Sequence, residues 1–443
     1  MLPWALNAVY LGATLLAIPW VVWRAWSGGR PVAAPWRRFT GRVAVLPRET
    51  GQRRIWLHGV SVGEVQLLAA LTAELRRQAE AAGQSLDCVV SSSTTTGLAV
   101  ATTRFGAASV FPCPLDFTWA VRTTLDRVRP DLIVLGELEL WPNLLDAARR
   151  RRIPVIVANA RMSERSAAGY ARLGPLARRM LRMLTLVIAR SDADAARFTT
   201  LGAERVVVTG SMKFDGVRGD REAAEVVRLR QVAGFTADDI VFLAGSTQAP
   251  EERLAAEAYL SLRDRYPALR LVIVPRHVER AAEIGAMLDG LGIPYRRRSG
   301  LATSGTDADC RVLLVDTTGE LGWWWGTAAI AFVGGSLDGV RGGQNMLEPA
   351  AYAAAVSFGP HTRNFRDEVA RLLDAEAAVV VDGGAALAAF VARCLDEPAW
   401  RQELGRRSRD VVETHRGATA ATARLVLERL AAGPVASSGP SAR

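Results

Sequence analysis

The sequence predicts an α/β protein with two doubly wound parallel sheets, preceded by an apolar N-terminal helix. From residue 55 onward, short apolar runs alternate with amphipathic stretches, which is typical of strands and helices in a parallel sheet. The alternation pauses once, over the charged segment 211–236, and then resumes. At the start of the chain, residues 2–23 carry no charged side chain. The 443 residues are enough for two domains, each with its own core.

The composition excludes several classes of protein. With 49% apolar and 23% charged residues, the chain is not intrinsically disordered. The formal net charge is +10, and Lys213 is the only lysine, so the excess is arginine, which suits phosphate or carboxylate partners. The sequence contains no nucleic-acid-binding module, which favours an anionic membrane surface or a phosphorylated substrate over nucleic acid. Four widely spaced cysteines form no C-x-x-C pair, so we expect free thiols and neither a zinc site nor a disulfide framework.

The apolar run at the N-terminus predicts a membrane anchor within residues 1–30. A helix over 2–23 is about 33 Å long at about 1.5 Å per residue, which matches the hydrocarbon core of a bilayer. Arg24, Arg30 and Arg37 all follow the run, whereas a signal peptide begins with positive charge. This order keeps the rest of the chain on the cytoplasmic face. A helix that lies on the membrane or packs on the first domain is the alternative.

The strands fall into two series, which place the domain boundaries. We expect two Rossmann-like domains, 31–215 and 216–430, facing one cleft, and a disordered tail at 431–443. The first series is 55–61, 86–93, 131–137, 154–160, 185–190 and 205–209. The second series is 239–245, 270–275, 311–316, 329–334, 354–358 and 377–381. Ligands of such sheets bind beyond the carboxyl ends of the strands, so the residues after each strand are the candidates for chemistry.

The first strand is followed by Ser61-Val62-Gly63-Glu64. A carboxylate there could act as a general base at the rim of the cleft. The same spacing is a capping box, with Ser61 as N-cap and Glu64 at N3, and spacing alone favours this structural role. His58, one pleat earlier, could lie in the core or in the cleft.

The third strand region is followed by Glu137, Glu139 and the dipeptide Trp141-Pro142. Two acids so close behind a buried parallel strand are unusual. One of them could cap the next helix, because Pro142 suits a first helical turn. The sequence leaves a functional role and a capping role equally open.

In the second domain, Ser246 and Thr247 follow a strand and precede a helical stretch. Small residues at such a turn can present backbone amides to an anion, although Ser and Thr are also ordinary caps. Arg276 follows the next strand, where a cation could face a phosphate. A solvated arginine is the alternative.

The segment 334–350 (GGSLDGVRGGQNMLEPA) is the strongest local signal. Its five glycines allow close approach of the backbone to a ligand. Asn345 and Glu348 open the next helix, where a carboxylate can accept both hydroxyls of a ribose while the helix start faces a phosphate. A glycine-rich turn with an Asn cap is the alternative. The nicotinamide-cofactor fingerprint and the Walker P-loop are both absent from the sequence.

Taken together, these segments resemble the 3-deoxy-D-manno-octulosonic acid (Kdo) transferases of lipopolysaccharide assembly. The matching strings occur in the family's order over most of 55–370. They are WLHGVSVGEV (56–65), GELELWPNL (136–144), ANARMSERS (158–166), GSMKFD (210–215), AGSTQAPEE (244–252), VPRHVER (274–280), DTTGELGWWW (316–325), FVGGSL (332–337) and GGQNMLEPAA (342–351).

The resemblance implies a B-type (GT-B) glycosyltransferase fold, with an acceptor-binding first domain and a nucleotide-sugar-binding second domain. It implies inverting transfer of Kdo from CMP-Kdo to lipid A precursor at the inner membrane, with no metal ion. Glu64 falls at the position of the catalytic base. Arg276, Asn345 and Glu348 fall at positions that contact CMP, and Ser246 and Thr247 on the loop that faces the donor phosphate. Gly63, Glu137, Glu139 and Lys213 are candidate acceptor or cleft residues.

Chemistry is consistent with these roles. A sugar hydroxyl is a poor nucleophile that needs a base, and the departing CMP phosphate can be stabilised by an arginine and backbone amides instead of a cation. Gln248 and Gln344 stand where the family commonly has His, so contacts to the donor sugar and the pH dependence can differ. A B-type enzyme that uses another activated sugar on a membrane lipid, or a membrane-tethered binding protein without catalysis, are the competing interpretations.

Overall fold

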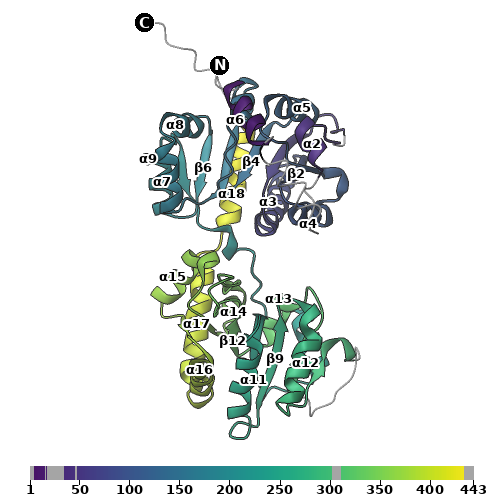
Figure 1. The fold of residues 1–443 in the computed structure, drawn as a ribbon, viewed down its shortest axis with the longest axis vertical. Helices are drawn as coiled ribbons and strands as arrows, with labels where there is room; N and C mark the ends of the chain where they lie inside the picture. Colours follow the sequence, from purple (N-terminus) through teal and green to yellow (C-terminus); the bar gives the residue numbers. More distant parts are fainter. Residues whose placement is uncertain (1–3, 15, 17–33, 45–46, 302–310, 434–443) are drawn as a thin grey trace. The chain divides into compact units, whose positions relative to one another are not determined.

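The computed structural model describes residues 4–14, 16, 34–44, 47–301 and 311–433. The chain divides into two units, Met1–Gly216 with Arg416–Arg443, and Val217–His415. Each unit contains a seven-stranded sheet flanked by helices (Figure 1). Every strand pair in both sheets is parallel. The expected α/β class with two parallel sheets is therefore confirmed.

The sheet of the first unit has the order β3-β2-β1-β4-β5-β6-β7. Its central strands are buried along their whole length, because helices cover both faces, and their apolar residues form one core on each side of the sheet. The strands are β1 (Arg53–His58), β2 (Leu86–Ser92), β3 (Val110–Pro112), β4 (Leu132–Gly136), β5 (Val155–Ala160), β6 (Leu186–Ala189) and β7 (Val206–Val208).

The helices of the first unit mostly follow the strands in alternation. They are α2 (Pro35–Thr40), α3 (Val62–Ala81), α4 (Thr95–Phe105), α5 (Thr118–Val128), α6 (Pro142–Arg150), α7 (Glu164–Arg172), α8 (Pro175–Arg182), α9 (Asp192–Thr200) and α18 (Ala418–Ala431). Residues 4–14 are also helical. The expected first turn at Pro142 is confirmed, with Pro142 at the start of α6.

Helix α18 belongs to the first unit, although the sequence analysis placed residues up to 430 in the second domain. Its apolar residues Ala423 and Val426 pack with the core on the α3 side of the sheet, and Figure 1 shows this yellow helix among the elements of the first unit. Both carboxylate oxygens of Asp215 accept bonds from the amides of Gly417 and Thr419 at 2.6 Å. This return of the chain could not be predicted from the sequence, because an apolar helix face does not specify the core that it joins.

The sheet of the second unit has the order β10-β11-β9-β8-β12-β13-β14. Its strands are β8 (Ile240–Thr247), β9 (Leu269–Pro275), β10 (Arg296–Arg297), β11 (Val312–Leu314), β12 (Ile330–Val333), β13 (Ala355–Phe358) and β14 (Ala378–Val380). Its helices are α10 (Ala224–Ala233), α11 (Glu251–Leu262), α12 (Ala281–Gly290), α13 (Leu321–Trp324), α14 (Leu347–Ala351), α15 (Arg366–Asp374), α16 (Gly384–Asp396) and α17 (Pro398–Thr414).

All twelve strand regions expected from the sequence contain a strand. Strands β3 and β10 were not expected; they are three and two residues long and lie at the sheet edges. The first strand was expected to reach residue 61, whereas β1 ends at His58 because Ser61 is already the N-cap of α3. Short edge strands carry too few residues for a period to be recognised.

The anchor expected in residues 1–30 falls largely outside the described residues, which include only 4–14 and 16 of that range. Within the described parts of the chain, no helix combines the length and the apolar character needed to cross a bilayer. The tail expected at 431–443 likewise lies outside them from residue 434 onward. Helical residues 4–14 are bound to the first unit through Asn7, whose amide nitrogen donates to Thr118 Oγ1 at 2.7 Å.

Candidate active site

In the first sheet the strand order reverses between β1 and β4, which pair with each other. From β1 the strands run outward to β2 and β3, and from β4 they run outward in the opposite direction to β7. Such a switch point is where doubly wound sheets bind ligands. Glu64 follows β1 and Glu137 follows β4, so both lie at this position. An ideal Cβ on Gly136, the last residue of β4, would lie 3.7 Å from Glu64 Oε2. The carboxylate of Glu64 therefore lies beside the end of β4.

The carboxylate of Glu64 is held by its own turn. Oε2 accepts the amide of Val60 at 2.9 Å, and Oε1 accepts the hydroxyl of Ser61 at 2.8 Å and its amide at 3.3 Å. The amide of Glu64 donates to Ser61 Oγ at 3.3 Å, which completes the capping box. The capping role expected from the spacing is confirmed, and it fixes the orientation of a half-buried carboxylate at the switch point.

Gly63 precedes Glu64 in the first turn of α3 and is exposed. A Cβ at this position would meet only Ser61 Oγ, at 3.9 Å. The protein itself therefore does not require a glycine here, and the small residue leaves open surface beside Glu64.

Two further carboxylates lie close to Glu64. Burial raises the pKa of Glu137, and the negative charge of Glu64 raises it further. Burial and then the charge of Glu64 raise the pKa of Glu139 to about 7. Glu137 has a φ of 53°, in the left-handed region that residues other than glycine rarely occupy. Three acids and an unfavourable backbone conformation at the carboxyl ends of two central strands are typical of a functional site.

Cations partly compensate this negative charge. Arg190, Lys213 and Arg161 each lower the pKa of Glu137. The structure thus brings the sole lysine to the same region as Glu64, Glu137 and Glu139. Arg161 and Arg190 were missed by the sequence analysis. The signal was present, because each directly follows a strand, β5 or β6.

His58 is a core residue. It is fully buried, and burial lowers its pKa to about 4, so the imidazole is neutral at physiological pH. Its Nδ1 lies 2.9 Å from Ser91 Oγ. The structure thus settles the choice between core and cleft that the sequence left open.

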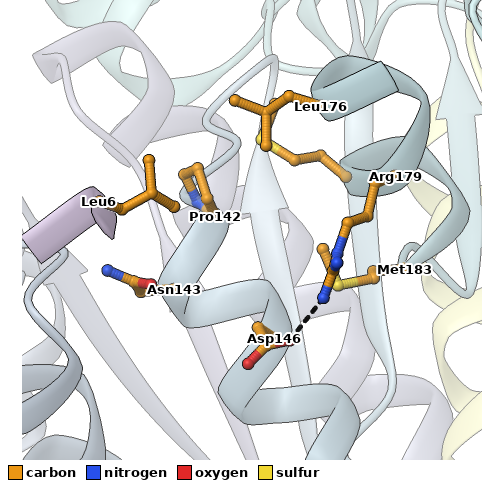
Figure 2. A pocket seen from close by; sticks show the side chains of 8 residues that line it. Leu6, Pro142, Asn143, Asp146, Leu176, Arg179 and Met183 are labelled. Atoms are coloured by element: carbon orange, nitrogen blue, oxygen red, sulfur yellow. Dashed lines mark hydrogen bonds and ion pairs between the residues drawn. The ribbon is translucent and has the colours of Figure 1, made fainter. Parts of the chain in front are cut away.

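The residues after Glu139 serve the packing of the N-terminal helix. Asn143 donates to Asn7 Oδ1 at 3.3 Å, and its backbone amide donates to Asp116 Oδ2 at 2.9 Å. Figure 2 shows the adjoining hollow between Leu6, the start of α6 and helix α8, where Arg179 pairs with Asp146 at 3.4 Å. Its volume of about 10 Å³ leaves room for at most one water molecule, so it is no ligand pocket.

The raised pKa of Glu139 predicts a pH-dependent stability. Because the folded protein keeps this proton up to about pH 7 and the unfolded chain loses it near pH 4.5, stability falls as pH rises between these values. We expect Glu139→Gln to raise the free energy of unfolding at pH 8 by about 1–2 kcal/mol, after allowance for partial exposure. At pH 4 the gain should vanish. Denaturant unfolding at both pH values measures it, with the exposed Glu80→Gln as control; an equal effect of both variants contradicts the prediction.

In the second sheet the order reverses between β8 and β12. Ser246 and Thr247 end β8, and the glycine-rich loop follows β12. Ser246 has a φ of 55°, and the register with β9 shifts between Gly245 and Thr247. The hydroxyl of Thr247 is buried and has no hydrogen-bond partner within the described part of the chain. The turn is thus distorted at the position where a ligand would bind.

Glu251 was missed by the sequence analysis, although it orders this region. Its buried carboxylate accepts the amides of Gly335, Ser336 and Leu337 in the glycine-rich loop, at 2.7, 3.0 and 3.2 Å. It also accepts the amide of Gln248 at 2.9 Å, so one side chain ties the turn after β8 to the loop after β12. Burial raises its pKa in spite of these four bonds. Its place in a helical stretch gave no sign of this role.

Glu348 lies at the end of the glycine-rich loop. Its Oε2 accepts the indole N–H of Trp325 at 3.1 Å and its Oε1 accepts the amide of Asn345 at 3.2 Å. Burial raises its pKa, while these bonds and the charges of Arg218 and Arg276 lower it. The structure therefore places Asn345 against Glu348 and the charge of Arg276 close enough to act on it.

The helix that follows, α14, differs from the expectation. It has only five residues, with Pro349 at its third position. Its dipole is correspondingly small, so the charge of a bound phosphate would have to be met by side chains and loop amides more than by the helix start.

The two glutamines that depart from the family pattern lie together. An ideal Cβ on Gly335 would lie 3.3 Å from Gln344 Nε2 and 3.6 Å from Gln248 Nε2. Both amide groups thus flank the first turn of the glycine-rich loop. They can exchange hydrogen bonds with a ligand there, but cannot carry a positive charge.

The described residues contain no group of three or more His, Cys, Asp or Glu side chains that could hold a metal ion. The structure therefore presents no built cation site in these ranges, and the acids around Glu64 face arginines and a lysine instead.

Comparison with known proteins identifies the family. Residues 37–216 match the model of the 3-deoxy-D-manno-octulosonic-acid transferases. The chain is 34% identical to such a transferase of Bordetella pertussis, over 90% of this chain and 93% of that protein. It is 33% identical to that of Haemophilus influenzae, over 82% and 84% of the two chains.

A UDP-GlcNAc 2-epimerase of Neisseria meningitidis has a similar fold, with a TM-score of 0.54 and 13% identity over 86% of this chain and all of that one. This likeness concerns the fold alone. The two sequence relatives cover most of this chain at more than 30% identity, and the chain belongs to the 3-deoxy-D-manno-octulosonic-acid transferase family of glycosyltransferases.

Proposed function

We propose that the protein is an inverting, B-type glycosyltransferase that moves Kdo from CMP-Kdo to lipid A precursor, without a metal ion. The observation that carries this proposal is the Glu348 carboxylate, oriented by Asn345 and Trp325 at the switch point of the second sheet. A fixed carboxylate there can accept both ribose hydroxyls of a nucleotide. Arg276 and the turn of Ser246 and Thr247 then face the nucleotide's phosphate.

In the first unit, Glu64 takes the proton of the attacking hydroxyl as the new bond to the anomeric carbon forms. Its carboxylate is preorganised by Val60 and Ser61 and is half-buried, so an acceptor can reach it. The charge of Glu64 acts on both Glu137 and Glu139, and we assign these two acids, with Lys213 and Gly63, to the acceptor side. A single in-line displacement inverts the anomeric centre.

In the second unit, CMP leaves as a phosphate monoester whose negative charge grows during the reaction. Arg276 and the amides beside Ser246 and Thr247 can stabilise this charge, which a metal ion does in other transferases. The network of Glu251 keeps the turn and the glycine-rich loop in place for this purpose.

The lipid acceptor implies action at a membrane, and we propose the cytoplasmic face of the inner membrane. The helical residues 4–14 expose Trp4 by 72% and Val9 by 66%, and the nearby α2 exposes Trp36 by 74%. Tryptophan is favoured at membrane interfaces. Arg37 and Arg38 in α2 add positive charge.

The proposal predicts one product. Purified full-length protein incubated with CMP-Kdo and lipid A precursor should give a lipid heavier by one or more Kdo residues, as weighed by mass spectrometry. Uridine- or guanosine-activated sugars are the control donors and should give no product. Transfer from one of these instead would favour another B-type enzyme.

The absence of a metal requirement is a separate expectation. The same reaction should proceed at an unchanged rate in EDTA, because an arginine and backbone amides are assigned to the leaving phosphate. The matched control is EDTA saturated with Mg²⁺. A loss of rate in EDTA that Mg²⁺ or Mn²⁺ restores would disprove the assignment.

A further inference from the structure

A cavity of about 210 Å³ in the second unit has no part in the chemistry described so far. Gly339 and Gly342 of the glycine-rich loop form one wall, and His361, Arg363 and Arg366 form the other. No carboxylate side chain lines it. The cavity is thus polar, positively charged and continuous with the loop that leads to the nucleotide-site candidates.

The glycines are required for the shape of this cavity. Gly339 and Gly342 have φ values of +68° and +83°, in the left-handed region that favours glycine. A Cβ on Gly342 would lie 2.4 Å from Arg363 Cγ, and one on Gly339 would lie 3.4 Å from the ring of His361. Arg363 donates to the carbonyl oxygen of Gly339 at 3.1 Å, so the two walls are tied together.

Two basic side chains in the cavity remain available to a ligand. The side chains of His361 and Arg366 are exposed, and neither forms a hydrogen bond or ion pair with any residue that the structure describes. Asp338, an acid of the loop, is engaged by the Arg341 side chain and by the amide of Val340. The positive charge of the cavity is therefore not neutralised by the loop.

We propose that this cavity binds the carboxylate of the donor sugar, an inference that rests on the proposed function. The transferred group is an octulosonic acid, and arginine matches a carboxylate in both charge and geometry. Only Gly343 and Gln344 separate the loop wall from Asn345, so the sugar and nucleotide subsites lie on one short segment. CMP carries no carboxylate, so the cavity should contribute to binding of CMP-Kdo and not of CMP.

The test compares two ligands on five variants of the full chain and the wild type. Calorimetry without acceptor gives the ratio of the CMP dissociation constant to that of CMP-Kdo. Arg366→Gln and His361→Gln should each lower this ratio about fivefold, the usual scale for partly exposed ion pairs, and the double variant about twenty-five-fold if the two effects add. The affinity for CMP alone should stay within about twofold in each. Arg253→Gln, an exposed cation on α11, is the matched control and should change neither affinity.

The outcomes separate this inference from the proposed function. A ratio of one in the wild type, or an unchanged ratio in the double variant, would overturn the subsite. A parallel loss of CMP affinity would mean that the cavity binds the nucleotide phosphate, which also overturns it. Binding of CMP-Kdo with the expected ratios but no transfer to lipid would instead refute the proposed function. Arg366→Lys keeps the charge and should retain most of the ratio.

Discussion

Glu64→Gln is expected to lower the rate of Kdo transfer by at least about 100-fold, the usual scale for loss of a general base. Glutamine keeps the shape of the side chain, and its single carbonyl oxygen can still accept either the amide of Val60 or the bonds from Ser61. The fold and the affinity for CMP should therefore be kept. Rates at saturating donor, with calorimetry for CMP, measure the two effects on one preparation.

The capping role of Glu64 requires its own control. Ser61→Ala removes the N-cap but leaves the carboxylate, so it should cost about 1 kcal/mol of stability and far less activity than Glu64→Gln. Glu164→Gln, in the first turn of α7, is the matched helix-start acid and should leave transfer unchanged. Equal losses of activity in Ser61→Ala and Glu64→Gln would show that the turn, and not a base, is what transfer requires.

Glu348→Ala and Asn345→Ala are expected to weaken CMP binding by about ten- to a hundredfold each. The reason is the loss of hydrogen bonds between a charged group and ribose hydroxyls, directly in the first variant and by loss of orientation in the second. Calorimetry on folded protein measures both affinities. Glu64→Gln is the control, because its side chain belongs to the other unit.

Truncation of Glu348 also leaves the indole N–H of Trp325 without its acceptor, so stability must be measured in parallel. Glu348→Gln can keep an acceptor for Trp325 through its carbonyl oxygen and separates this effect, because it removes the negative charge and the acceptor for Asn345 but leaves the packing in place. Unchanged CMP affinity in both Glu348→Ala and Asn345→Ala would place the nucleotide elsewhere in the chain.

Much of the fold followed from local patterns. Buried parallel strands are continuous apolar runs, so all twelve expected strand regions could be recognised, whereas β3 and β10 were too short. The capping box at Ser61 and Glu64 and the helix start at Pro142 are also local, because their hydrogen bonds and backbone angles involve residues within one turn.

Fewer residues of the candidate site than elements of the fold could be predicted from the sequence. Residues that directly follow strands were found, because parallel strands direct their carboxyl ends to one edge. Glu251 was missed, since it reaches the loop from a helix more than eighty residues earlier in the chain. Arg161 and Arg190 were missed although they follow strands, because the sequence does not show that their charges act on Glu137.

The sequence by itself determined the α/β class, the two parallel sheets, the family and the residues that end the strands, because period, turn chemistry and motif strings are properties of short segments. Only the tertiary structure decided that α18 joins the first unit, that His58 is buried and neutral, and that Glu64, Glu137 and Glu139 share one sheet edge. It alone also brought His361 and Arg366 beside Gly339 and Gly342. Such contacts depend on which strands become neighbours in the sheet and on which charged side chains are buried close together. Neither can be deduced from the residues of one short segment.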